Sequence, residues 1–177
     1  MKKVFISTLL FVSFITARAQ QGGVTFANNA ATPITAYGTN VNARVALYGS
    51  PSIGLANDSS LVSIGAPVNT FAPGFFSGGT RNIGGPGDTV TLQVRAWTGA
   101  YATYEAAQAG AVGGDFSVML GRHAMWVQPV GGGTLPTQPI TGPGRFQGLD
   151  ITIPEPSTVS LLILGAATLV LGLRRKK

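Results

Sequence analysis

Glycine and proline interrupt the middle of this chain so often that no long helix fits there. Six clusters rich in these residues lie between positions 49 and 144, at 49–51, 78–79, 84–88, 113–115, 131–133 and 142–144. Clusters of this kind form turns. The segments that they leave between them are short, so the sequence predicts a fold of short strands joined by turns.

The clearest strand is residues 89–97, in which apolar and polar side chains alternate. Its apolar positions fall on one face: Val90, Leu92, Val94 and Ala96. Its polar positions fall on the other: Thr91, Gln93 and Arg95. Strict alternation over this length predicts an antiparallel strand that is buried on one face only.

Further segments complete a mainly β prediction. Alternation or β-forming residues mark 23–27, 43–48 (with Ala43, Val45 and Leu47 on one face) and 146–153 (with Leu149, Ile151 and Ile153 on one face), and more weakly 60–68, 116–120 and 125–130. Residues 101–109 favour one short helix that ends at Gly110. The expected fold is a β-sandwich or jelly-roll-like domain with one short helix. Because the chain has no cysteine, its apolar core must hold it together without disulfides.

The formal net charge of +6 comes from the two ends of the chain. Between Gln20 and Ile153 five arginines oppose five acidic residues, and there is no lysine. Nucleic-acid binding needs a basic patch on the folded domain. We therefore expect no nucleic-acid partner.

The first 19 residues have the three parts of a secretory signal peptide. Lys2 and Lys3 form a positive start, residues 4–15 are mostly apolar, and Ala17 and Ala19 form a small-x-small cleavage site. This pattern predicts cleavage before Gln20 and an exported domain over 20–153. An uncleaved anchor or a buried first helix is the alternative.

The last 24 residues, 154–177, combine a short motif, an apolar run and a basic end. The motif is Pro154-Glu155-Pro156, followed by Ser157 and Thr158, either of which can cap a helix. Residues 159–173 carry no charge and predict a single transmembrane helix, slightly short for a typical bilayer. The basic end, which holds this side in the cytoplasm, consists of Arg174, Arg175, Lys176 and Lys177.

This order of features resembles the PEP-CTERM sorting signal of Gram-negative bacteria. The resemblance implies recognition by an exosortase, a membrane-embedded cysteine transpeptidase-like enzyme. It also implies a precursor anchored in the inner membrane and a final place at the cell surface or in the extracellular polysaccharide matrix. A plain C-terminal anchor that is never cut is the alternative. More loosely, residues 45–49, 93–97 and 104–107 resemble stretches of small β-rich PEP-CTERM proteins of verrucomicrobial type, which implies no activity.

The sequence assembles no evident catalytic or metal site. His123 is the only histidine, and one histidine supplies neither the usual multi-histidine metal site nor, without partners, a catalytic triad. No serine lies in a Gly-x-Ser-x-Gly motif. Asp88 and Asp115 adjoin glycines, where aspartates usually bind their own backbone. We expect no enzyme activity, no cofactor and no metal.

Three functions remain open for the exported domain. The first is a non-enzymatic structural or adhesive protein. The second is a carbohydrate-binding module for extracellular polysaccharide, with Trp97 and Trp126 as stacking platforms; the alternative is that both tryptophans complete the core. The third is a small surface hydrolase, which needs two facing carboxylates or a serine beside His123.

Overall fold

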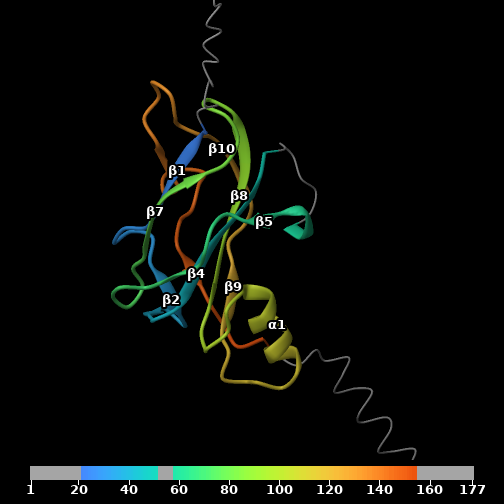
Figure 1. Cartoon of the computed structure of the whole chain (residues 1–177). Coiled ribbons are helices and arrows are strands. Elements are labelled where there is room, and N and C mark those ends of the chain that lie inside the picture. Colours follow the sequence, from blue (N-terminus) through green and yellow to red (C-terminus); the bar gives the residue numbers. More distant parts are fainter. Residues whose placement is uncertain (1–20, 52–57, 155–177) are drawn as a thin grey trace, which may run out of the picture.

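The computed structural model describes residues 21–51 and 58–154 (Figure 1). The predicted signal peptide, most of the sorting motif, the apolar run 159–173 and the basic end lie outside these residues. No helix within the described ranges is long and apolar enough to cross a membrane.

The domain is mainly β with one short α-helix, as the sequence predicts. A six-stranded sheet contains β4 (Arg44–Ser50), β5 (Val62–Ser63), β6 (Val68–Asn69), β8 (Thr89–Trp97), β9 (Leu120–Arg122) and β10 (Trp126–Pro129). A three-stranded sheet has the order β11 (Gln138–Pro139), β1 (Gly23–Ala27), β7 (Ser77–Asn82). A second three-stranded sheet has the order β12 (Leu149–Asp150), β2 (Ile34–Ala36), β3 (Thr39–Asn40). The helices are α1 (Tyr104–Val112) and a 3-10 turn, η1 (Asp58–Ser60).

Strand β8 is the centre of the domain, and its predicted bounds and alternation are confirmed. It pairs antiparallel with β4 over seven residue pairs. The four apolar side chains on its first face are all fully buried in the main core. They pack there with Val45 and Leu47 of β4, and with apolar residues of β1 and β2. The core therefore lies between the six-stranded sheet and the two smaller sheets.

The sequence predicted that the polar face of β8 would be exposed, and this prediction is wrong. Thr91, Gln93 and Arg95 are 2%, 3% and 7% exposed, so the strand is buried on both faces. Helix α1 covers this side of the sheet, where its Tyr104 packs with Trp97 in a second apolar cluster. Polar alternation therefore indicated which face each side chain takes, but it did not predict that a helix would cover the polar face.

Helix α1 runs two residues beyond the predicted end at Gly110. Thr103 caps its start, because the side chain accepts a hydrogen bond from the Ala106 N–H at 3.2 Å. Gly113 caps its end. Gly110 lies inside the helix, and an added Cβ there would collide with the Tyr101 hydroxyl. Close packing, not helix termination, accounts for this glycine.

Residues 78–79 were expected to form a turn, and this prediction is wrong, because both lie within β7. The ring of Phe26 packs on Gly78, where an added Cβ would lie 2.4 Å from the Phe26 Cδ1. Gly79 has a φ of +67°, and the β1–β7 register shifts near this point. Glycines in a strand often mark such a bulge or a close approach.

The remaining strand predictions agree with the structure to different degrees: β4 extends beyond its predicted end, whereas of 116–120 only Leu120 lies in a strand, so that prediction is wrong. Segment 43–48 corresponds to β4, 60–68 contains β5 and ends at β6, 116–120 reaches the start of β9, and 125–130 contains β10. In 146–153 only Leu149–Asp150 is a regular strand. Ile151 is fully buried, but Ile153 is 38% exposed, so Ile153 does not share the buried face. The reason is a change of pairing partner, since the chain leaves β2 after Ile151 and pairs with β9 at Thr152.

Candidate functional site

The folded domain ends at a backbone pair between Thr152 and Leu120. The Leu120 N–H donates to the Thr152 carbonyl at 2.8 Å, and the Thr152 N–H donates to the Leu120 carbonyl at 3.0 Å. Just before this pair, the Ile151 N–H donates to the Thr35 carbonyl at 2.7 Å. Gly121 makes room for Ile151, because an added Cβ would lie 2.7 Å from its Cγ2. The chain is thus held in the fold up to two residues before Pro154.

A groove runs along α1 to this junction. Two cavities, of about 450 and 230 Å³, share Tyr104, Gln108 and Arg122 as lining residues. The cavity away from the junction is also lined by Ser59, Leu61, Arg95 and Glu105. The cavity at the junction is also lined by Val112, Leu120, Thr152 and Pro154. Positions 104, 108 and 112 are spaced by four and therefore share one face of the helix.

An ionic and aromatic cluster fixes α1 to the sheet beside this groove. The Arg95 Nη1 lies 3.0 Å from the Glu105 Oε1. The Arg95 guanidinium lies 3.9 Å from the centre of the Tyr48 ring and 5.3 Å from that of Tyr104. Its Nε also donates to the Gln93 side chain at 2.7 Å. Because Arg95 is desolvated, these contacts hold it in one geometry against the first turn of the helix.

The same cluster gives the domain a sensitivity to alkaline pH. Burial raises the pKa of Tyr48, and its hydrogen bond to Glu105, at 2.8 Å, raises the pKa further. The neutral phenol is favoured in the folded state, so its contribution is fully present below the ordinary tyrosine pKa of about 10. The contribution is lost as the pH rises from there through the raised pKa, at up to about 1.4 kcal/mol per pH unit for one proton.

We expect Tyr48→Phe to be less stable than the wild type near pH 8, by about 1 kcal/mol for the lost hydrogen bond. Above pH 10, however, its stability should fall less steeply than that of the wild type. Urea unfolding at a series of pH values measures both effects. Tyr37→Phe is the matched control, because Tyr37 is 68% exposed. Equal alkaline slopes for wild type and Tyr48→Phe would contradict the assignment.

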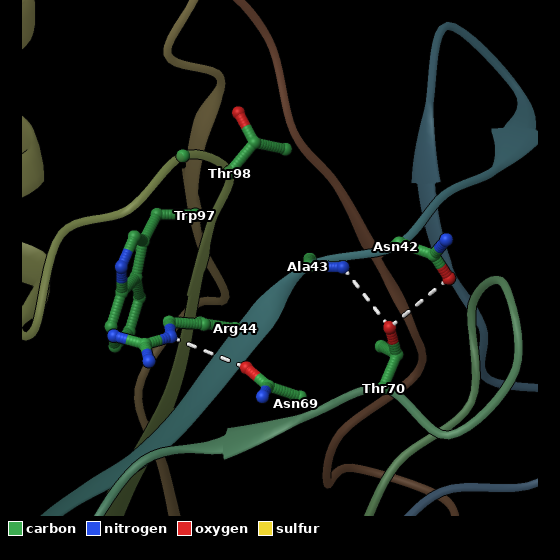
Figure 2. A pocket seen from close by; sticks show the side chains of 8 residues that line it. Asn42, Ala43, Arg44, Asn69, Thr70, Trp97 and Thr98 are labelled. Carbon is green, nitrogen blue, oxygen red and sulfur yellow. Dashed lines mark hydrogen bonds between the residues drawn. The ribbon is translucent and has the colours of Figure 1, made fainter.

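A smaller polar pocket of about 200 Å³ lies where β4 begins and β8 ends (Figure 2). Arg44 crosses it, donating from Nε to the Asn69 side chain at 3.2 Å and from Nη1 to the Tyr101 carbonyl at 2.7 Å. Thr70 accepts a hydrogen bond from the Ala43 N–H at 3.1 Å. The remaining lining residues are Asn42, Trp97, Thr98 and Gly99. Amide and hydroxyl groups therefore line this pocket, and several of them join β4 to β6.

The two tryptophans proposed as stacking platforms do not offer a face to a ligand. Trp97 is fully buried and Trp126 is 6% exposed. Their ring N–H groups donate inside the domain, Trp97 to the Tyr101 carbonyl at 2.9 Å and Trp126 to the Gln128 side chain at 2.8 Å. The stacking assignment is therefore wrong. Large aromatic area is used to complete a core that has no disulfide.

His123 has a structural environment. Its Nδ1 donates to the Ala124 carbonyl at 2.7 Å, and its Nε2 accepts from the Gln147 N–H at 3.3 Å. The ring packs against Trp126 and Phe146, with centroids 5.5 and 5.2 Å away. Both ring nitrogens are thus engaged with backbone groups.

Three of the acidic residues outside the Arg95 cluster also serve local structure. Asp88 accepts from the Gly85 N–H at 2.6 Å, as expected for a turn aspartate. Asp115 accepts from the Ser117 hydroxyl at 2.5 Å and from the Tyr101 hydroxyl at 2.8 Å, and these bonds lower its pKa. Asp150 accepts from the Thr35 hydroxyl at 2.8 Å. Within residues 21–51 and 58–154, no group of three or more His, Cys, Asp or Glu residues could hold a metal ion.

Comparison with known proteins identifies the C-terminal segment of the chain. A family model, the PEP-CTERM protein-sorting motif, matches residues 152–176. No curated protein and no solved structure shows significant similarity to the chain. Of the predicted sorting residues, Pro154 lies at the rim of the groove, whereas Glu155, Pro156, Ser157 and Thr158 lie outside the described residues. The chain carries a PEP-CTERM sorting motif, which implies export, a membrane-associated precursor and sorting by an exosortase.

Proposed function

We propose that this chain is exported and sorted to the cell surface or extracellular matrix of a Gram-negative bacterium as a non-enzymatic structural or adhesive protein. The observation that carries the proposal is the position of the motif. The match begins at Thr152, the residue that makes the last described backbone pair of the domain. The fold is therefore complete where the sorting signal starts.

The proposed topology follows from the charges and apolar segments of the two ends. Cleavage before Gln20 releases the N-terminus outside the inner membrane. Residues 159–173 span that membrane, and Arg174, Arg175, Lys176 and Lys177 remain in the cytoplasm. An exosortase then recognises Pro154-Glu155-Pro156. A sandwich arrangement of the domain is part of the proposal, supported by a core shared between the six-stranded sheet and the smaller sheets.

The environment of the polar groups supports a non-enzymatic role. A hydrolase would need two facing carboxylates or a serine against His123. His123 is engaged with backbone groups, and Asp88 and Asp115 are engaged in their own turns. Glu105 is engaged with Arg95 and Tyr48.

A carbohydrate-binding role is the second candidate, and the polar pocket of Figure 2 favours it. Its amide and hydroxyl groups suit a polyhydroxylated ligand. Retention of the full chain on the host's extracellular polysaccharide, reduced by Asn42→Ala, would support this function. Equal retention of the two proteins would argue against this pocket.

The sorting proposal is tested by changing the motif in the full chain in its host. We expect the variant Pro154→Ala/Glu155→Gln/Pro156→Ala to accumulate uncut in the inner membrane, because the recognised residues are gone. The matched control is Gly165→Ala/Thr168→Val, which changes the apolar run but keeps it uncharged. Membrane, surface and medium fractions are compared by immunoblot. Normal processing of the motif variant would contradict sorting through these residues.

A further inference from the structure

The tether between the domain and the membrane is short. Six residues, 153–158, separate Thr152, held by β9, from Val159, the first residue of the apolar run, so seven Cα–Cα steps join the two. Even a fully extended chain of that length spans at most about 25 Å. In the anchored precursor of the proposed function, the end of the domain that carries Thr152 therefore lies close to the lipid surface.

The structure shows which surface is at this end. Thr152 and Pro154 line the same cavity as Val112, the last residue of α1. The Asp115 N–H donates to the Gly110 carbonyl at 3.0 Å, so the loop that carries Phe116 lies against the last turn of α1. Figure 1 shows α1 beside the end of the described chain, whereas β1, near its start, lies toward the opposite end of the domain. Helix α1 and the loop that follows it are thus the parts nearest the membrane.

Two large apolar side chains are exposed on this surface. Val112 is 83% exposed and Phe116 is 58% exposed. Single exposed apolar residues are common on protein surfaces and need no explanation by themselves, as for Val127 on β10. Val112 and Phe116 differ from such single exposed residues because the short tether brings them close to the lipid bilayer. Contact with lipid would remove their surface from water.

We propose that Val112 and Phe116 form a membrane-docking surface, which rests the domain on the lipid while the sorting motif awaits processing. This inference rests on the proposed function, since it requires the anchored precursor. The docking is apolar in character, because this end carries charges of both signs, Asp115 in the loop after α1 and Arg122 in the junction cavity. It should therefore change little with salt or with the content of anionic lipid.

The absence of cysteine from the chain permits a direct test by single-site labelling. The full chain is reconstituted into vesicles of phosphatidylcholine, with or without phosphatidylglycerol. An environment-sensitive fluorophore is attached at Ala109→Cys on the exposed side of α1, or at the control position Val127→Cys. A quencher carried on lipid headgroups reports proximity to the membrane. We expect strong quenching at position 109 and several-fold weaker quenching at position 127, in both kinds of vesicle.

A second variant separates docking from mere tethering. Val112→Ser/Phe116→Ser alters only exposed side chains, so the fold should persist, and circular dichroism checks this. With the label at position 109, quenching should fall toward that of position 127. Equal quenching at 109 and 127 in the wild type would overturn docking on lipid, and is the result expected if these residues instead face the processing enzyme. Unchanged quenching in the double variant would also overturn it. Failure of the chain to float with vesicles would refute the anchored precursor itself, and so separates the two proposals.

Discussion

Replacing Trp97 by alanine is expected to lower the free energy of unfolding by about 3–5 kcal/mol, the range for a large aromatic side chain removed from a core. Trp97 is fully buried at the end of β8. Its ring meets Tyr104 of α1 edge to face, with centroids 6.2 Å apart. Its N–H holds the Tyr101 carbonyl. The substitution therefore leaves a cavity and also loosens the attachment of the helix.

Chemical denaturation followed by circular dichroism measures this effect. Phe71→Ala is the matched control, because Phe71 is aromatic but 74% exposed, and its removal should cost less than about 1 kcal/mol. A loss for Trp97→Ala no larger than that for Phe71→Ala would show that Trp97 is not a core residue. It would also reopen Trp97 as a ligand-stacking platform.

Replacing Ile151 by alanine is expected to lower the free energy of unfolding by about 2–4 kcal/mol, as for other buried isoleucines. Ile151 is fully buried where the chain passes from β2 to β9. Its side chain secures the segment that makes the Thr152–Leu120 pair, so loosening should concentrate at this junction. Local opening would release the end of the domain and lengthen the effective tether to the sorting motif.

Hydrogen exchange at the Thr152 and Leu120 amides reports the opening directly, and denaturation reports the total loss. Ile153→Ala is a control of the same residue type two positions on, with a side chain that is 38% exposed. Ile153→Ala should lower the free energy of unfolding by less than about 1 kcal/mol. Hydrogen exchange at the Thr152 and Leu120 amides should stay slow in this variant. Fast exchange at Thr152 in the wild type would contradict a motif that begins at a fixed point of the fold.

The strands that the sequence predicted best are those in which local pattern and final environment agree. In β8 the apolar positions alternate and all of them reach the main core, so both the bounds and the buried face were readable. Strand β1 was also predicted with its observed bounds. Helix α1 was expected because residues 101–109 are rich in helix-forming side chains.

The failures arise where a distant contact decides the conformation. Gly78 and Gly79 resemble a turn, but they lie in β7, which pairs with β1, and the ring of Phe26 packs on Gly78. Gly110 resembles a helix end, but it lies inside α1 with the ring of Tyr101 packed against it. The polar face of β8 looked solvent-exposed because its cover comes from a helix later in the chain. Local propensity cannot encode any of these contacts.

The candidate site also has parts that the sequence showed and parts that only the fold shows. The sorting motif could be read from the sequence because its prolines, apolar run and basic end are consecutive. The pairing of Thr152 with Leu120 could not be read, because it joins residues 32 positions apart through hydrogen bonds of the backbone alone. The cluster of Arg95, Tyr48 and Glu105 also escaped notice, since the three residues come from β8, β4 and α1. Only the fold shows that the motif starts beside a groove and an exposed apolar surface.

The most direct test of the central claim is the intact mass and C-terminal sequence of the protein recovered from its host, with membrane, surface and medium analysed separately. Sorting through the motif predicts a surface or medium form that starts near Gln20 and ends between Pro154 and Thr158, with or without an added group at the new end. A chain that starts near Gln20 but still ends at Lys177 in every fraction would contradict exosortase processing. It would mean that the C-terminal segment is a permanent anchor.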